Sequence, residues 1–428
     1  MSARNRELMA LIPASLLVTV GFAAIFIQRN EVLSNVSLTY GGIFLGLCFV
    51  AHLVIRFTLP HADPYLFPLV AVLACFGLVV IYRIDEDLAR VQAQWFVIGL
   101  IAFALTIFLL RDFRVLERYR YTIALAGLAL LLLPRVPGIG QQVNGAYLGV
   151  GVGSISFQPS ELGKIAIVIF LAAYLQDNRR VLVQGSRRIL GVTIPPLKHL
   201  GPLLVVWGAA MFMLVFIRDL GSSLMYFGAF LALLYVATNR LSFVVIGLLM
   251  FGVGAWFFAT TVGHVQDRID IWLDPFATYD GTGYQIANGM FAQADGGLFG
   301  RGLGAAVLNV PGGGRLIPAP ETDMIYAVIV NDLGLVGGAG VIATYLLIAE
   351  RGFKIATLAT DSFSKLLATG LTAVMALQVF VIVGGVTRVI PLTGVTLPFV
   401  SYGGSSIVAN FILLALLLLI SDRARKPA

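Results

Sequence analysis

Long apolar stretches separated by short polar segments repeat along nearly the whole chain. Residues 9–27 and 93–110 are typical, because each approaches the ~20 apolar residues that a helix needs to cross about 30 Å of hydrocarbon. A single helix satisfies all its own backbone polar groups inside lipid, so the pattern predicts an all-α polytopic membrane protein with about twelve transmembrane helices. The predicted spans are 9–27, 38–57, 65–82, 93–110, 121–133, 162–175, 201–217, 221–237, 241–262, 323–350, 366–385 and 404–421.

Composition and charge agree with a chain that lies in the membrane. Of 428 residues, 59% are hydrophobic and 12% are charged, against roughly 25% charged residues in soluble domains. The first span lacks a small-residue cleavage site, so we expect it to be retained, with the N-terminus on the inner side. Nineteen of the 29 Lys and Arg residues then fall at inner ends and eight in outer loops, as the positive-inside rule expects. The net charge of +7 therefore indicates membrane orientation, with both termini inside, rather than a nucleic-acid partner.

The connection at residues 263–322 is the longest outer loop. A loop of this length inside a compact domain usually carries a function. It is rich in glycine and aromatic residues, and its segment YQIANGMFAQA is expected to form a short amphipathic helix at the membrane interface. The outer segments 134–161 and 386–403 have a similar Gly-rich or Pro-rich texture, which is typical of backbone folded over an outward cavity. Ser160 is expected to cap the helix that follows it, with Glu161 and Lys164 on one face of that helix.

Ionisable residues gather where apolar sequence meets these outer segments. Charge in hydrocarbon is unfavourable and usually faces a protein cavity. Two interpretations stay open, a polar cavity open to the outer face or structural ion pairs such as Glu161 with Lys164. The other boundary residues are Arg218, Asp219, Glu321, Asp323 and, about 13 Å further along its helix, Asp332.

Several motifs together resemble those of the SEDS family (shape, elongation, division and sporulation), which includes RodA, FtsW and SpoVE. The matching stretches are FQPSELGK (157–164), RDLGSS (218–223), YDGTGYQIANG (279–289), GGLFGRGLG (296–304), ETDMIYA (321–327) and LTGVTLPFVSYGGSS (392–406). They occur in the family's order across roughly residues 65–422. Because the family core has ten spans, the resemblance implies that residues 1–60 add two N-terminal helices to a core at 61–428, with its catalytic loop near 263–322.

The resemblance implies a peptidoglycan glycosyltransferase in the bacterial cytoplasmic membrane. Such an enzyme polymerises lipid II at the outer face and works with a class B penicillin-binding transpeptidase. Asp280 matches the family's essential aspartate, and Glu161, Lys164 and Asp219 match polar positions that line its central cavity. The short C-terminal tail favours the elongation type over division or sporulation. The chain departs from the family pattern at Tyr147-Leu148, at Glu321 and at Asn331-Asp332, which makes the donor contacts less defined than Asp280.

The chemistry of chain growth explains why a carboxylate is expected. A sugar hydroxyl must attack an anomeric carbon that bears a lipid diphosphate, and a carboxylate that accepts the hydroxyl proton typically accelerates such a step ~10²- to 10⁴-fold. Asp280 is the candidate base, and attack without an enzyme nucleophile inverts the anomeric centre. The leaving diphosphate needs positive charge, which a divalent cation such as Mg or Mn can share, although no metal-ligand motif identifies one. The outer basic residues available are Lys164, Arg218, Arg268, Arg301, Arg315 and Arg388.

Three alternatives remain at this point. Asp280 precedes a glycine and can simply form a turn. The protein can be a carrier that flips lipid II, although carriers usually show repeats with broken helices and polar residues at the midplane. It can also be a non-catalytic scaffold for a transpeptidase.

Overall fold

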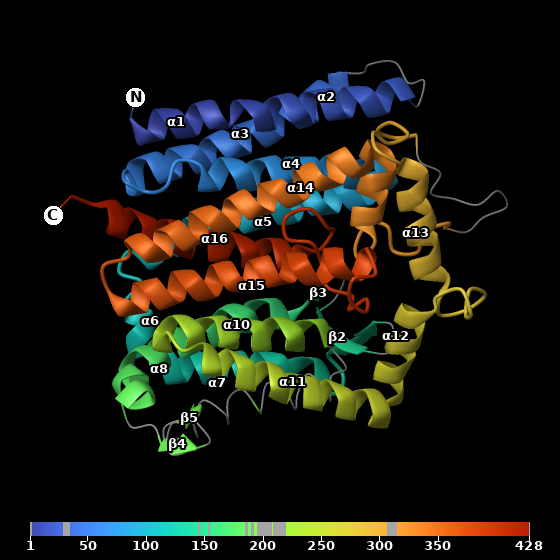
Figure 1. The fold of residues 1–428 in the computed structure, drawn as a ribbon. Coiled ribbons are helices and arrows are strands. Elements are labelled where there is room, and N and C mark those ends of the chain that lie inside the picture. The colour runs from blue at the N-terminus through green and yellow to red at the C-terminus, as the bar shows by residue number, and fades with distance from the viewer. Residues whose placement is uncertain are drawn as a thin grey trace. The chain divides into compact units, whose positions relative to one another are not determined.

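The structure is a computed structural model in which the chain forms two compact units (Figure 1). One unit comprises residues 1–109, 268–351 and 378–428, and the other comprises residues 110–267 and 352–377. The described residues are 2–28, 35–143, 146–152, 155–184, 187–189, 192–194, 208, 220–305 and 315–427.

The first unit is built from long helices. α2 packs against α4, and α5 packs along α16, which together with α4 is among the most deeply buried helices of the chain. Three helices belong only partly to this unit, namely α12 (Gly263–Leu273), α14 (Ile325–Leu358) and α15 (Ser362–Val386). Its other helices are α1 (Ala3–Ala10), α2 (Ile12–Gln28), α3 (Asn35–Thr58), α4 (Leu66–Ile84), α5 (Glu86–Leu109), α13 (Tyr284–Gly296) and α16 (Gly404–Arg425).

Aromatic packing holds α5 against α16. The ring of Phe411 lies edge-on to Phe96, Phe103 and Phe399, with ring centroids 5.3, 6.2 and 5.3 Å apart. Edge-to-face pairs of this kind contribute about 0.5–1.5 kcal/mol each beyond the area that they bury. The C-terminal helix is therefore a central element of the unit.

The N-terminal helices are tied to the rest of the unit by buried polar groups. Arg4 pairs with Glu7 and donates to the carbonyl of Ala62, and Glu7 lies 2.8 Å from Nδ1 of His52. Charged groups buried in this way need partners, because an unpaired charge is strongly unfavourable in an apolar environment. The contact of Glu7 with His52 thus connects α1 with α3, and the hydrogen bond from Arg4 to Ala62 connects α1 with the segment that precedes α4.

The second unit combines helices with short strands. β1, β2 and β3 form an antiparallel sheet in which Gly140 pairs with Val150 and Val152 with Ile155. Its elements are α6 (Val115–Arg118), α7 (Arg120–Leu132), η1 (Leu133–Arg135), β1 (Gly140–Val143), β2 (Ala146–Val152), β3 (Ile155–Phe157), α8 (Pro159–Gln184), β4 (Arg187–Ile189), β5 (Val192–Ile194), α10 (Leu220–Thr238) and α11 (Leu241–Thr261).

The sheet adds to the expectation for residues 134–161. That segment was expected only to fold over an outward cavity, and strand pairing gives its described peptide groups regular hydrogen-bond partners. The predicted cap at Ser160 is wrong, because α8 already begins at Pro159, a residue whose fixed φ suits the first helical position.

The all-α membrane fold is confirmed. Ten helices among the described residues are long and apolar enough to cross a membrane. α7 coincides with the predicted span 121–133, but its 13 residues are fewer than a full crossing needs. The predicted span 201–217 lies outside the described residues apart from Gly208. The segment YQIANGMFAQA forms α13, as expected.

Candidate functional site

Asp280 lies in the turn region between α12 and α13. The turn is stabilised at its start by Asp274, whose Oδ1 accepts from the N–H groups of Phe276 and Ala277 at 3.2 Å. Further along, Gly281 and Gly283 both donate to the carbonyl of Thr278 at 3.0 Å. The Asp280 side chain is exposed, and among the described residues no ion pair is recorded for its carboxylate. The turn therefore presents the Asp280 carboxylate to solvent, while the Asp274 side chain stabilises the backbone.

Aromatic rings gather beside Asp280. Tyr279 lies 5.5 Å from Tyr284 and 6.4 Å from Phe291 between ring centroids, and Phe276 lies 5.7 Å from Phe291. Of these rings, Phe276, Tyr279 and Phe291 expose more than a third of their surface. The candidate base thus borders an exposed apolar surface of the kind that favours a membrane interface or an amphipathic ligand.

Two of the outer arginines hold α12 in place. Arg388 has a positive φ of 61° and donates from Nε to the carbonyl of Trp272 at 2.7 Å, while the Trp272 indole donates to the carbonyl of Arg388 at 3.0 Å. Arg268 donates to the carbonyl of Leu392 at 3.1 Å. Both side chains therefore bind main-chain carbonyls, which fixes the segment that leads into the Asp280 turn.

The loop after α13 docks onto a break in α14. At Gly334, φ is 68° and ψ is −174°, so the helical hydrogen bonds from Leu335 to Asn331 and from Val336 to Asp332 cannot form. The loop supplies all four missing partners, which matters because unsatisfied backbone groups are costly away from water. Arg301 and Gly302 donate to the carbonyls of Asn331 and Asp332, both at 2.9 Å. Leu335 and Val336 donate to the carbonyls of Gly297 and Leu298, at 2.9 and 3.1 Å.

We call this arrangement of residues 296–302 on residues 330–336 the loop clasp. Side chains stabilise it on both its exposed and its buried side. On the exposed side, Arg301 pairs with Asp295 and Asn331 donates to Asp295 at 3.2 Å, and these contacts hold the pKa of Asp295 below its ordinary value. On the buried side, Nε of Arg83 lies 2.9 Å from Oδ2 of Asp332, with 4% and 1% of the two side chains exposed. The clasp therefore joins the end of α13 to α14 and α4.

Replacing Gly334 with Ala is expected to destabilise the protein measurably. The backbone conformation at Gly334 is open essentially to glycine alone, and an added Cβ would lie 2.3 Å from the carbonyl oxygen of Leu298. We expect a loss of at least 1–3 kcal/mol, seen as a lower melting temperature in detergent. Gly340→Ala is the matched control, because that position lies on the same helix and faces open space. Equal melting temperatures for the two variants would contradict the clasp.

The motif ETD is joined to the motif SYGG by a hydrogen-bond network. The N–H of Tyr402 donates to the carbonyl of Glu321, and Oγ of Ser401 donates to the carbonyl of Thr322, both at 2.8 Å. The buried Gln92 side chain supports this segment by donating to the carbonyl of Ser401 at 3.1 Å. Two motifs that lie about eighty residues apart in the sequence thus form one structure.

Charged side chains lie beside this network. Nη1 of Arg315 lies 2.6 Å from Oε2 of Glu321, and both groups are partly exposed. Burial raises the pKa of the neighbouring Asp323 to about 6, although nearby Arg268 acts in the opposite direction and Glu321 adds to the rise. Asp323 is therefore the group in this region that titrates near neutral pH.

The raised pKa of Asp323 predicts a pH-dependent stability. The folded protein binds this proton more tightly than the unfolded chain, whose carboxyl has a pKa near 3.8, so the Asp323 contribution is present below about pH 4 and is lost as the pH rises through 6. A shift of about two units corresponds to about 3 kcal/mol. Melting temperatures measured between pH 4 and 7 should fall with rising pH in the wild-type protein. Asp323→Asn should remove this fall in stability. If the wild-type and variant curves stay parallel, Asp323 does not titrate in this range.

The remaining predicted site residues belong to the second unit. Glu161 and Lys164 form a buried ion pair in α8, with Nζ 2.6 Å from Oε2, as their spacing predicts. Arg218 and Asp219 lie outside the described residues.

Sequence reasoning missed several residues that organise these structures. Arg83 is buried in the clasp, Asn331 was noted only as a departure from the family pattern, and Asp295 and Gln92 were not singled out. Only Arg83 gave a usable signal, as a charge that directly follows an apolar span. Within the described parts of the chain, no group of three or more His, Cys, Asp or Glu residues is placed to hold a metal ion.

Comparison with known proteins agrees with these features. A family described as "Cell cycle protein", which covers FtsW, RodA and SpoVE, matches residues 64–426. A Mycobacterium bovis protein called "Peptidoglycan glycosyltransferase RodA" is 41% identical over 435 residues, which cover 99% of this chain and 92% of that protein. "Stage V sporulation protein E" of Bacillus subtilis is 30% identical over 345 residues, covering 80% of this chain and 90% of that protein.

Solved structures show the same fold. The Thermus thermophilus rod shape determining protein RodA superposes with a TM-score of 0.60 and 26% identity, covering 86% of this chain and 98% of that one. A chain from a structure described as a peptidoglycan synthase complex gives a TM-score of 0.66 at 25% identity, covering 86% of this chain and 99% of that one.

The helical membrane architecture and the match over residues 64–426 define the class of this protein. The chain belongs to the family of FtsW, RodA and SpoVE, integral membrane proteins of bacteria. Within that family it is RodA-like, since its identity to the RodA protein of M. bovis, 41%, exceeds the 30% that it shares with the sporulation protein.

Proposed function

We propose that this protein is a peptidoglycan glycosyltransferase that polymerises lipid II at the outer face of the bacterial cytoplasmic membrane. The observation that carries the proposal is the 41% identity to a protein called peptidoglycan glycosyltransferase RodA, over nearly the full length of both chains. The RodA-like sequence favours a role in cell elongation and shape over division. Residues 1–60 are then two helices added to the catalytic core at 61–428.

Asp280 is the proposed general base. Its carboxylate accepts the proton of the attacking sugar hydroxyl while the oxygen bonds to the anomeric carbon and the bond to the lipid diphosphate breaks. The electron pair of that bond leaves with the diphosphate, and the configuration is inverted. Two features support this role, the exposure of Asp280 and the aromatic rings at its side, which offer an apolar surface to an amphipathic substrate.

The developing charge on the diphosphate needs cations. Arg301 and Arg315 are suitable, because the guanidinium of each is partly exposed and pairs with a surface carboxylate, from which it can be drawn to a more highly charged ligand. A divalent cation brought in with the diphosphate would act in the same way. Glu161, Lys164, Arg218 and Asp219, together with Glu321 and Asp323, are further residues proposed to bind substrate, because they lie in motifs that resemble those of the family.

The orientation and the partner complete the proposal. The excess of Lys and Arg at one set of helix ends favours a topology with both termini in the cytoplasm. A class B penicillin-binding protein is the proposed partner, as supported by the resemblance to a chain of a peptidoglycan synthase complex.

The experiment is to supply the purified protein and its partner transpeptidase, blocked with a β-lactam, with lipid II. The expected product is a ladder of glycan chains on a gel. The same protein in liposomes should move labelled lipid II across the bilayer no faster than empty vesicles do. Rapid movement of lipid II across the bilayer without polymer formation would support the carrier hypothesis. Absence of both activities would support the hypothesis of a non-catalytic scaffold.

A further inference from the structure

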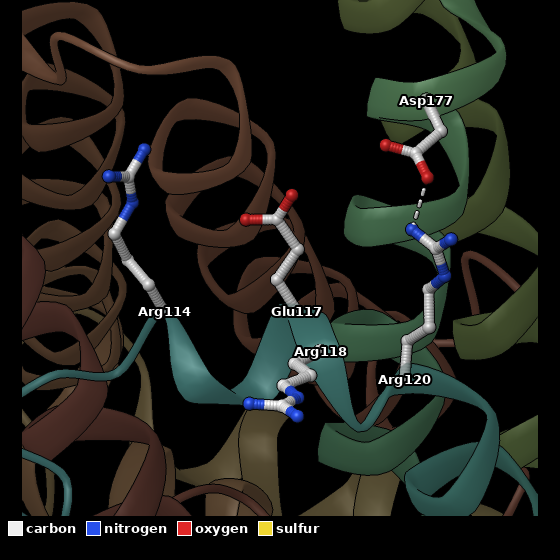
Figure 2. Close-up of a pocket in the computed structure, with 5 residues that line it drawn as sticks. All are labelled: Arg114, Glu117, Arg118, Arg120 and Asp177. Atoms are coloured by element: carbon white, nitrogen blue, oxygen red, sulfur yellow. Dashed lines mark hydrogen bonds and ion pairs between the residues drawn. The ribbon is translucent and has the colours of Figure 1, made fainter.

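A pocket of mixed charge lies in the second unit, where α6 and the start of α7 approach α8. It has a volume of about 310 Å³ and is lined by Arg114, Glu117, Arg118, Arg120 and Asp177. Figure 2 shows Arg114 and Glu117 pointing to the same side of α6, with Arg120 reaching Asp177 beside them. Neither the proposed reaction nor the outer motifs use this pocket.

The charges of the pocket are only partly neutralised. Arg120 pairs closely with Asp177. Arg114 is held loosely, because its Nη2 lies 3.8 Å from a carboxylate oxygen of Asp361, and that carboxylate already accepts from the N–H and the hydroxyl of Ser364. A loosely held guanidinium is free to bind another anion.

The other two lining residues also keep binding capacity. For Arg118, no carboxylate partner is recorded among the described residues, and the side chain is exposed. Glu117 accepts a hydrogen bond of 2.6 Å from the amide of Gln176, a neutral donor that leaves its charge in place. The pocket thus offers two available cations and one available anion.

The surroundings of the pocket suit a position at the depth of lipid headgroups. It lies where α7 begins and where α8 approaches the end of its apolar span at Arg180. Tyr119 and Tyr121 are 51% and 58% exposed, and the guanidiniums of Arg118 and Arg120 lie 6.0 and 5.2 Å from their rings. Exposed tyrosines beside arginines are typical of the interface between water and hydrocarbon.

We propose that this pocket binds the headgroup of phosphatidylethanolamine. A guanidinium binds a phosphodiester well, which assigns the phosphate to Arg114 with Arg118 at the rim. The primary ammonium carries three N–H donors, which suit Glu117 with Asp177 beside it. An anionic glycerol headgroup has no ammonium for Glu117, and a choline headgroup has no N–H to donate. In the proposed orientation, with both termini in the cytoplasm, the site lies in the inner leaflet.

The test measures lipid binding to the full-length protein by native mass spectrometry. Delipidated protein in detergent is titrated with phosphatidylethanolamine, phosphatidylcholine and phosphatidylglycerol that have identical acyl chains. We expect phosphatidylethanolamine to bind about tenfold more tightly than phosphatidylcholine, as the loss of charged hydrogen bonds implies. Glu117→Gln should reduce this preference to about twofold or less and should strengthen phosphatidylglycerol binding, because the repulsive charge is gone.

The controls separate a specific site from general adhesion. The double change Arg114→Gln and Arg118→Gln should weaken binding of all three lipids about tenfold. Arg90→Gln is the matched control, since Arg90 is exposed, lies close to Glu86 and Asp87, and does not line this pocket. Glu117→Gln keeps an acceptor for Gln176 and should fold normally. Equal binding of the three lipids, or a preference unchanged by Glu117→Gln, would overturn the proposal whether or not the protein is a glycosyltransferase.

Discussion

Replacing Asp280 with Asn is expected to abolish most lipid II polymerisation while leaving the fold intact. Asparagine has nearly the same volume and is readily accepted in turns, but it cannot accept the proton of the attacking hydroxyl. Loss of a general base typically slows such a step ~10²- to 10⁴-fold. Because the side chain is exposed and no ion pair is recorded for it among the described residues, we expect no change in melting temperature. The measurement is the initial rate of glycan formation on a gel.

Asp270→Asn is the matched control for this experiment. Asp270 is an exposed aspartate in α12, ten residues before Asp280, so the same chemical change is made on the same outer segment. We expect its polymerisation rate to remain within about twofold of the wild type, as is usual for exposed positions away from a site. An Asp280→Asn protein with wild-type activity would exclude the proposed base without excluding the enzyme.

Most of the helical fold could be predicted from the sequence, because the bilayer imposes a minimum length on every apolar span. Predicted spans such as 65–82 and 404–421 correspond closely to α4 and α16. The short sheet of β1, β2 and β3 could not be predicted in the same way. Its strands hold only three to seven residues, and their pairing depends on contacts between segments rather than on a periodic pattern.

The candidate site likewise contains features that local sequence predicts and contacts between distant segments that it does not predict. Motif resemblance was enough to single out Asp280, and a spacing of three residues was enough to predict the pair of Glu161 with Lys164. Nothing local predicts that Gln92 supports the SYGG segment or that Gly296–Gly302 completes the broken helix α14. Such contacts join residues tens to hundreds of positions apart, and a single sequence carries no record of that proximity.

The break in α14 also explains why a buried ion pair lies beneath the clasp. Asp332 sits two residues before Gly334, where its carbonyl accepts from Gly302 and its carboxylate lies in the protein interior. A buried carboxylate without a cation is strongly unfavourable, so Arg83 at the end of α4 stabilises the segment that receives the loop. The ion pair is therefore expected to stabilise α14 where the loop docks. Through the loop it should also stabilise the positions of α13 and the Asp280 turn.

Replacing Arg83 with Met is accordingly expected to destabilise the protein by about 3–5 kcal/mol, because it removes the cation that lies 2.9 Å from the buried Asp332 carboxylate. The double variant Arg83→Met with Asp332→Leu removes both charges and should recover most of that loss, since apolar residues often replace a buried pair at little cost. Melting temperatures of the two single variants and the double variant form a cycle that isolates the coupling. Arg90→Gln, which breaks an exposed ion pair, should change stability by no more than about 1 kcal/mol. Additive losses in the cycle would show that Arg83 and Asp332 act independently, and the clasp would then depend on its backbone hydrogen bonds alone.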